Sequence, residues 1–328
     1  KDTYSANLQQ AAESITESEV ATYVGVLAHD AMFGRWSPSP QLNRAADYIA
    51  GEFSRAGLQP GNDGEFLQWF ALPSAQVLPG SFTRLDSGAG EDLPFSIQGP
   101  VPSGPVPGEP GGEFVAPNVI GWIEGSDPQL NHEYVVFTAH FDHIGTSPVA
   151  SPTGDDVFNG ADDNASGSAA LLEIAEAFGS LDTPPARSVL FIATSAEERG
   201  LVGAMYYTSY PTYPLENAIA NLNLDMIGRN DPSTVQVIRQ STSDLGELVQ
   251  SVAASHGDIG VSPIDSPDDQ LVRRSDCFAF LLSGIDALFF HSGLHDDYHG
   301  LDDEPPALTV GEVLGLRAGE VQIGRAHV

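Results

Sequence analysis

The 328-residue chain is predicted to fold as an α/β domain whose central sheet is mixed but largely parallel and is covered by helices on both faces. Two observations carry this prediction. Short apolar runs, typical of buried strands, alternate along the chain with segments that have the apolar spacing of amphipathic helices. Several of these runs are followed closely by an acidic residue or a histidine. In open α/β sheets, ligands bind at the carboxyl ends of the strands, so the same pattern points to a site.

Two helices are expected near the N-terminus. Thr16 and Glu19 have the spacing of a capping box, and apolar residues follow at helical intervals. A second apolar stripe covers residues 42–53 and is stopped by Gly57. We interpret both helices as scaffold. His29, just past the first helix, is expected to have a surface or capping role.

One domain is expected to cover residues 1–328, with an irregular segment at about residues 76–116. Residues 86–112 are rich in glycine and proline, which neither a helix nor a central strand can use. A strand is predicted to resume at residues 118–123. The sequence therefore indicates an excursion from a single domain rather than a second domain.

The core strands and the helices between them are predicted from apolar runs and their spacing. Strands are expected at residues 135–139, 187–194, 221–224 and 287–290. Helices are expected at residues 171–178 and 245–252, where apolar residues recur three and four positions apart. This alternation is what favours parallel pairing, because parallel strands need crossover connections.

The charge balance restricts the possible partners. The chain has 45 acidic and 13 basic residues, a net charge of −32, and Lys1 is its only lysine. Such a surface repels nucleic acid and anionic lipid, which makes both improbable partners. We interpret it as a solvated acidic surface suited to salty or extracellular surroundings.

Cysteine content and hydropathy limit the chain further. Cys277 is the only cysteine, so no intrachain disulfide can form, and we interpret it as a small buried residue. No apolar run reaches the roughly 18 residues of a membrane span. The chain begins at Lys1 without a signal-like segment, which fits a processed secreted or periplasmic protein better than one from a salt-adapted cytoplasm.

Several common catalytic motifs are absent from the sequence. It has no G-x-S-x-G elbow, no phosphate-binding Walker loop and no G-x-G-x-x-G. His132 and Glu133 are not followed by a histidine at position 136, so the H-E-x-x-H zinc helix is also missing. The chemistry must then come from other carboxylates and histidines.

Five such residues follow apolar segments and are expected to converge on one metal site. Each has a structural explanation when taken alone; the Asp162–Asp163 pair, for example, could serve a turn or a helix cap. As a set they are harder to dismiss, because two histidines and three carboxylates suit two divalent metals that share one carboxylate. The candidate ligands are His140, Asp162, Glu198, Asp225 and His299.

The same segments resemble the M28 family of zinc aminopeptidases, with five blocks in the family's order. The blocks are residues 140–142, 160–167, 196–200, 223–228 and 297–299. The resemblance implies a zinc-exopeptidase fold of the phosphorylase/hydrolase-like type. It also implies two Zn²⁺ per chain and peptide substrates with a free N-terminus. Many relatives carry an inserted protease-associated domain, and segment 76–116 stands in its place here.

The resemblance further implies a role for each candidate ligand. His140 and Asp225 would hold one zinc, and Glu198 and His299 would hold the other. Asp162 would bridge the two ions. The family often has a histidine where Cys277 stands and a serine where Ala204 stands, but neither position is a ligand.

Other residues would carry the reaction itself. Asp142 would fix the imidazole of His140, and Glu197 would be the general base. Tyr298 would donate a hydrogen bond to the developing oxyanion, and Arg274 would bind substrate. An acid-lined pocket suits the cationic amine of a peptide's N-terminus, which favours an exopeptidase over an endopeptidase.

Two other functions remain open. One is a glutaminyl-cyclase-like enzyme, which has this fold but works with one zinc, or another amidohydrolase of the M28 fold. The other is a non-catalytic binding ectodomain that has lost its metals. The full ligand set, including His140, favours the aminopeptidase over the first, and Glu197 beside it favours the aminopeptidase over the second.

Overall fold

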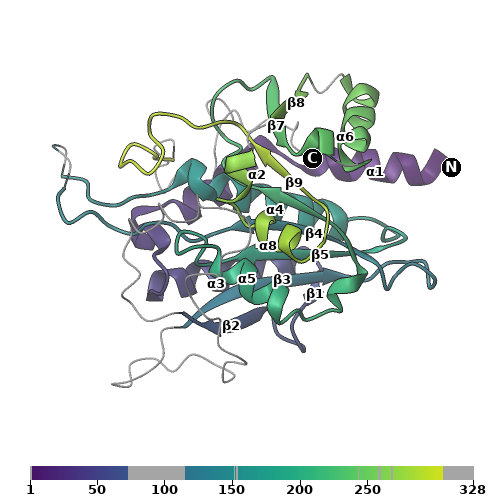
Figure 1. Cartoon of the computed structure of the whole chain (residues 1–328), viewed down its shortest axis with the longest axis horizontal. Coiled ribbons are helices and arrows are strands. Elements are labelled where there is room, and N and C mark those ends of the chain that lie inside the picture. The colour runs from purple at the N-terminus through teal and green to yellow at the C-terminus, as the bar shows by residue number, and fades with distance from the viewer. Residues whose placement is uncertain are drawn as a thin grey trace.

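A computed structural model describes residues 2–72, 115–150, 152, 154–242, 244–257, 260–266 and 269–305 of the chain. The predicted irregular segment at about 76–116 lies outside the described residues except for its last two, which begin a strand. The predicted α/β class is confirmed. Helices cover both faces of a nine-stranded mixed sheet, which runs from β2 and β1 at the bottom of Figure 1 to β7 and β8 at the top.

The sheet is parallel in its centre and antiparallel toward its edges. Its order is β1-β3-β5-β4-β6-β9-β7-β8, with β2 also paired to β3. Four of the eight pairings are parallel, so "largely parallel" describes only the central strands β5, β4, β6 and β9 together with the β7–β8 pair. The strands are β1 (Gln59–Pro60), β2 (Leu67–Ala71), β3 (Val115–Ile123), β4 (Tyr134–His140), β5 (Ser188–Thr194), β6 (Ala218–Leu224), β7 (Thr234–Ile238), β8 (Ser262–Ser266) and β9 (Ala287–His291).

The apolar runs form strands because both faces of the sheet are buried. Every residue of β5 is buried. Its Phe191 faces the core that contains α2, α3 and α4, whereas its neighbours Leu190 and Ile192 face Tyr207 of α5 and Phe280 of α8. Side chains of a strand alternate between the faces, so a strand covered on both sides has an unbroken apolar run.

The helices begin and end where their sequence signals lie. The side chain of Thr16 accepts from the backbone N–H of Glu19, which confirms Thr16 as the N-cap of α2, but the backbone N–H of Thr16 donates to Glu173, so the second bond of the predicted capping box is not formed. Gly57, with φ of +83°, follows the second of the two predicted helices. His29 caps η1 by accepting from Ala31, which confirms its capping role. The α-helices are α1 (Asp2–Ser14), α2 (Glu17–Leu27), α3 (Pro40–Arg55), α4 (Gly167–Gly179), α5 (Val202–Ser209), α6 (Asp244–Ser255), α7 (Asp269–Val272) and α8 (Cys277–Leu282). The short turns are η1 (Asp30–Arg35), η3 (Ala161–Ser166), η4 (Leu215–Asn217) and η5 (Gln240–Thr242).

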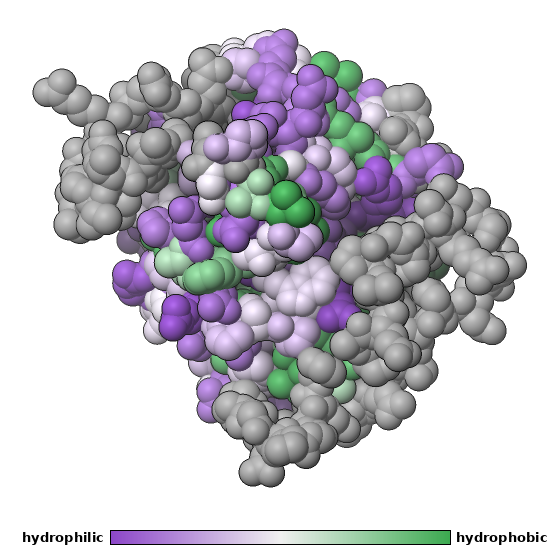
Figure 2. Space-filling model, turned by 90° about the vertical axis from the view of Figure 1, so that its left-hand side faces the viewer, coloured by the Kyte–Doolittle hydropathy of each residue, from purple (hydrophilic) through white to green (hydrophobic). Residues whose placement is uncertain are grey.

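The face of the molecule drawn in Figure 2 is mainly hydrophilic where its residues are described. On the face drawn in Figure 2, hydrophobic residues form only small patches between polar ones. Within the described ranges, no helix combines the length and apolar character needed to cross a bilayer.

A carboxyl group is buried where α2 packs on α4. Glu173 of α4 is 2% exposed, and its Oε2 accepts from the backbone N–H of Thr16 at 3.2 Å. Its Oε1 has no hydrogen-bond partner among the described residues. Burial, with help from the nearby Glu19 and Glu176, raises the pKa of Glu173 to about 8. The folded protein therefore favours the protonated form of this group.

We expect Glu173→Gln to reduce the loss of stability between pH 5 and pH 8. Because the pKa of Glu173 is raised by folding, its contribution is fully present below the ordinary pKa of 4.5 and is lost as the pH rises through about 8. Glutamine keeps the acceptor for Thr16 and does not ionise. Thermal midpoints at both pH values check this, with roughly 2–4 °C gained at pH 8 for each kcal/mol relieved. Equal declines in the two proteins would contradict it.

Candidate metal centre

The candidate ligands lie where the central parallel strands end. His140 is the last residue of β4, and Asp225 directly follows β6. Glu198 lies in the loop after β5, and His299 in the loop after β9. Because the carboxyl ends of parallel strands share one edge of the sheet, these residues from distant parts of the chain meet there.

Asp163, rather than Asp162, lies between the histidines. The Nε2 atom of His140 is 3.3 Å from Oδ1 of Asp163, and the Nε2 atom of His299 is 3.0 Å from its Oδ2. The two oxygens of this carboxylate thus face two different groups of candidate ligands. The expectation that Asp162 occupies the bridging position is therefore corrected to Asp163.

The side chain of Asp162 points away from this position. Its Oδ1 accepts from the backbone N–H of Gly228 at 2.6 Å, and its Oδ2 lies 3.2 Å from Nε2 of His295. Asp303, fully buried, accepts the backbone N–H groups of both Asp162 and Asp163. Successive side chains of η3 point in different directions, and these contacts hold the turn so that Asp163, and not Asp162, faces His140 and His299.

The first group of candidate ligands comprises His140, Glu197 and Asp225, each offering an atom within 4.8 Å of the others. Nε2 of His140 lies 3.5 Å from Oδ1 of Asp225 and 4.0 Å from Oε2 of Glu197. The other oxygen of Asp225 accepts from the hydroxyl of Ser275 at 2.7 Å. These contacts point the free side of the His140 ring at the two carboxylates.

Asp142 lies behind this group, as expected for a residue that orients His140. The Nδ1 atom of His140 is 3.2 Å from the carbonyl oxygen of Asp142 and 3.7 Å from its Oδ1. The same Oδ1 accepts from the backbone N–H of Glu197 at 3.1 Å. Asp142 therefore holds both His140 and the start of the loop that carries Glu197.

The second group comprises His143, Asp163, Glu198 and His299. Nε2 of His299 lies 3.3 Å from Oε1 of Glu198. Nδ1 of His143 lies 2.9 Å from the same oxygen. His143 was not among the residues expected from the sequence, although it follows His140 by only three positions.

Three residues at or next to the candidate site residues have a left-handed backbone conformation. Ala196, Met226 and His299 have φ values of +58°, +53° and +54°. Non-glycine residues rarely adopt this conformation, which persists only where surrounding contacts enforce it. Here it turns the chain sharply just before Glu197, just after Asp225 and at His299 itself.

A buried arginine fastens the segments behind the site. Arg35 is fully buried and donates to the carbonyl oxygens of Phe141 at 2.7 Å, Asn159 at 2.7 Å and Gly160 at 3.0 Å. It also donates to the carbonyl of Leu27. One side chain thus joins the end of α2, the end of β4 and the loop that leads to Asp163.

Mutual contact shifts the pKa values of the cluster. Burial lowers the pKa of His140, but Glu197 and Asp225 outweigh it and raise the pKa well above its usual value. Burial raises the pKa of Asp163, but hydrogen bonds from His140 and His299 bring it well below the usual range. Burial likewise raises the pKa of Glu198, but His143 and His299 bring it down to about 2. For Glu197, burial prevails and the pKa is raised well above normal.

The residues fit a divalent metal. Four buried carboxylates converge here, and their ion pairs in the described part of the chain are with histidines alone. Buried carboxylates need a cation, and imidazole and carboxylate are the ligands that zinc accepts. The carboxylates are those of Asp163, Glu197, Glu198 and Asp225.

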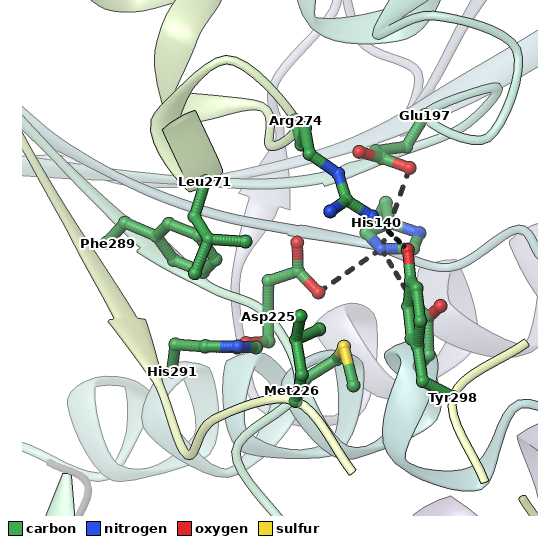
Figure 3. Close-up of a pocket in the computed structure, with 11 residues that line it drawn as sticks. His140, Glu197, Asp225, Met226, Leu271, Arg274, Phe289, His291 and Tyr298 are labelled. Carbon is green, nitrogen blue, oxygen red and sulfur yellow. Dashed lines mark hydrogen bonds and ion pairs between the residues drawn. The ribbon is translucent and has the colours of Figure 1, made fainter. Parts of the chain in front are cut away.

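A pocket opens onto the first group, and Tyr298 and Arg274 stand at its edge. Figure 3 shows Glu197 and Asp225 directed at His140, with the hydroxyl of Tyr298 pointing toward the same imidazole. Arg274 donates to that hydroxyl at 2.9 Å, and the Tyr298 ring stacks on His299 with 3.9 Å between centroids. Both residues expected at the substrate thus line the pocket.

The comparisons with known proteins agree with a metal site in this fold. A model of peptidase family M28 matches residues 118–314. The chain belongs to peptidase family M28. Over 113 residues it is 36% identical to the aminopeptidase YwaD of Bacillus subtilis, an alignment that covers 34% of this chain and 22% of that enzyme.

Solved structures share the fold over most of the chain. The LapA aminopeptidase of Legionella pneumophila matches with a TM-score of 0.61 and 19% identity, covering 92% of this chain and 69% of that one. A glutaminyl cyclase of Bacteroides thetaiotaomicron matches with a TM-score of 0.58 and 18% identity, covering 88% and 90%. The chain spans less than half the length of the curated relatives that it matches first, between 22% and 44%.

We expect Asp163→Asn and Asp162→Asn to differ in zinc binding. Only the Asp163 carboxylate faces both groups, so its loss should prevent two ions from binding. Asp162→Asn should keep two, with affinity lowered at most by the roughly 10–100-fold typical of residues that orient ligands. Calorimetric titration of the metal-stripped proteins with Zn²⁺ checks this. Loss of both ions from Asp162→Asn alone would reverse the assignment.

Proposed function

We propose that this chain is a metal-dependent aminopeptidase that hydrolyses the N-terminal bond of peptides with the help of two zinc ions. The observation that carries the proposal is Asp163, whose two oxygens face the two groups of candidate ligands. Membership of peptidase family M28 and the likeness to an aminopeptidase support it. The substrates proposed are peptides with a free N-terminus.

Each ion would be held by one histidine, one carboxylate and the shared Asp163. His140 and Asp225 would hold one ion, and Glu198 and His299 the other. We assign His143 to orienting Glu198, because its Nδ1 lies 2.9 Å from that carboxylate. Zinc bound at such a site lowers the pKa of water to roughly 7 and polarises a carbonyl group.

Glu197 would act as the general base. It is buried beside His140, and its backbone N–H is fixed by Asp142. From this position it would accept a proton from the attacking water and pass it to the leaving amine. This assignment distinguishes Glu197 from its neighbour Glu198, whose carboxylate contacts His143 and His299 instead.

Tyr298 would stabilise the oxyanion. Its oxygen accepts a hydrogen bond from Arg274, so its own hydrogen is free to be donated into the pocket. Burial raises the pKa of Tyr298 and keeps the hydroxyl protonated. A donor held in this way stabilises the negative charge that develops on the carbonyl oxygen.

The acidic surroundings support action at an N-terminus, since they suit the cationic amine of a peptide. A cyclase that works with one zinc would leave one of the two groups of ligands without a role, and a non-catalytic ectodomain would leave Glu197 without one. Secretion or a periplasmic location stays a prediction, with which the acidic composition is compatible.

We expect Glu197→Gln to separate catalysis from metal binding. Glutamine keeps the volume of the side chain but cannot take up the proton. For an aminoacyl-anilide, kcat should fall on the order of 10²–10⁴-fold while KM changes far less. Zinc content, measured by atomic emission, should stay near that of the wild type.

The matched control is Glu198→Gln, one position away. It should weaken zinc binding, because Glu198 is proposed as a ligand. If Glu197→Gln loses zinc and Glu198→Gln keeps it, the two roles are exchanged. Nearly full kcat in Glu197→Gln would show that it is not the base.

A further inference from the structure

The pocket beside His140 has a polar side and an apolar side. His140, Asp163, Glu197 and Asp225 form the polar side, where the peptide bond and the amine of a substrate would lie under the proposed function. Leu271 and Phe289 supply apolar surface on the other side, and Met226 and Leu294 also line the pocket. Figure 3 shows Leu271 and Phe289 across Asp225 from Glu197 and Tyr298. The side chain of the first substrate residue would therefore enter the apolar side.

His291 adds a polar atom to this apolar side. It is the last residue of β9, is 2% exposed and lines the pocket. In Figure 3 its ring extends toward Asp225 and Met226, below Leu271 and Phe289. If the imidazole of His291 only filled space, both of its nitrogens would be hydrogen-bonded, or an apolar ring would stand in its place.

The hydrogen bond of one ring nitrogen of His291 determines whether the other nitrogen is a donor or an acceptor. Nδ1 of His291 lies 2.9 Å from the backbone carbonyl oxygen of Asp225. A carbonyl oxygen only accepts, so Nδ1 carries the hydrogen. The Nε2 atom of the neutral ring is then an acceptor, and this buried atom has no hydrogen-bond partner among the described residues. Leaving such an atom unpaired is unfavourable, and a donor placed against it is favoured.

We propose that His291 determines specificity by accepting a hydrogen bond from the side chain of the first substrate residue. This inference rests on the proposed aminopeptidase activity. The preferred residues carry a hydroxyl or amide donor on a short carbon chain, as threonine and asparagine do. The apolar wall contacts the carbon atoms, and Nε2 of His291 accepts from the donor. Side chains of the same shape that lack a donor leave Nε2 unpaired.

Isosteric substrate pairs test the inference. The anilides of threonine and valine have nearly the same shape, as do those of asparagine and leucine, and only the first of each pair has a donor. The measured quantity is the ratio of kcat/KM within a pair, in which any general loss of activity cancels. We expect the wild type to favour the donor-bearing member by about tenfold, the effect of one buried hydrogen bond made or left unmade.

Two variants separate the nitrogens of the ring. His291→Asn keeps a donor near the position of Nδ1 but has no atom at that of Nε2, so the preference should disappear. His291→Gln can place an amide oxygen near the position of Nε2, so part of the preference should return. Thermal midpoints and zinc contents of both variants establish that they are folded and loaded.

The outcomes distinguish the inference from the proposed function. A wild type that cleaves the anilides but prefers valine and leucine overturns the role of His291, even if no variant folds. An equal ratio in the wild type and in His291→Asn does the same, and both results leave the aminopeptidase intact. Failure of the zinc-loaded wild type to cleave any aminoacyl-anilide overturns the proposed function and the inference with it.

Discussion

The burial of several carboxylates at one edge of the sheet is the constraint on which the rest of the structure depends. Asp163 and Glu198 lie in one group of candidate ligands and Glu197 and Asp225 in the other, and all four side chains are largely out of water, which is unfavourable without positive charge. Among the described residues their ion pairs are with imidazoles, which carry at most part of the compensation. A cation bound between them resolves the conflict. The surrounding fold therefore holds these carboxylates and imidazoles together as a site that is ready to bind a cation.

The contacts that surround the site fix its backbone more than its side chains. Arg35 uses its buried guanidinium on four carbonyl oxygens, from three separate segments, and Asp303 accepts the N–H groups of the turn that carries Asp163. The burial of Arg35 lowers its pKa to about 10, so it remains charged at neutral pH. Its positive charge lies behind an acidic site without pairing with any ligand. Arg35 and Asp303 thus bind peptide groups of the site and leave its four carboxylates to the histidines and to Ser275.

Much of the fold could be predicted from the sequence, because a strand covered on both faces needs an unbroken apolar run. β4, β5 and β9 have nearly continuous apolar runs, whereas β6 carries the buried Asn221 and Asn223 between its apolar residues. The ends of β4 and β6 placed His140 and Asp225 at one edge of the sheet. The choice between Asp162 and Asp163 failed because both lie in the irregular turn η3, where neither the strand nor the helix period says which way a side chain points. His143 could have been found from its spacing, because it follows His140 by three positions. Arg35 and Asp303 bind backbone groups that are distant in the sequence, and such contacts have no sequence pattern.

The same distinction between strand and loop explains how the site combines rigidity with selectivity. Residues at the strand ends, His140 and His291 among them, are held by the sheet and by backbone contacts, so their nitrogens have fixed directions. Tyr298 and His299 come from a loop, in which their rings stack on each other and His299 has left-handed backbone. A substrate carbonyl would thus lie between a rigid imidazole and a loop-borne hydroxyl. The first residue's side chain would meet Phe289 and His291 of β9 and Leu271 of α7, together with Met226 and Leu294 from adjoining loops, and there a single unpaired nitrogen can discriminate between side chains of equal shape.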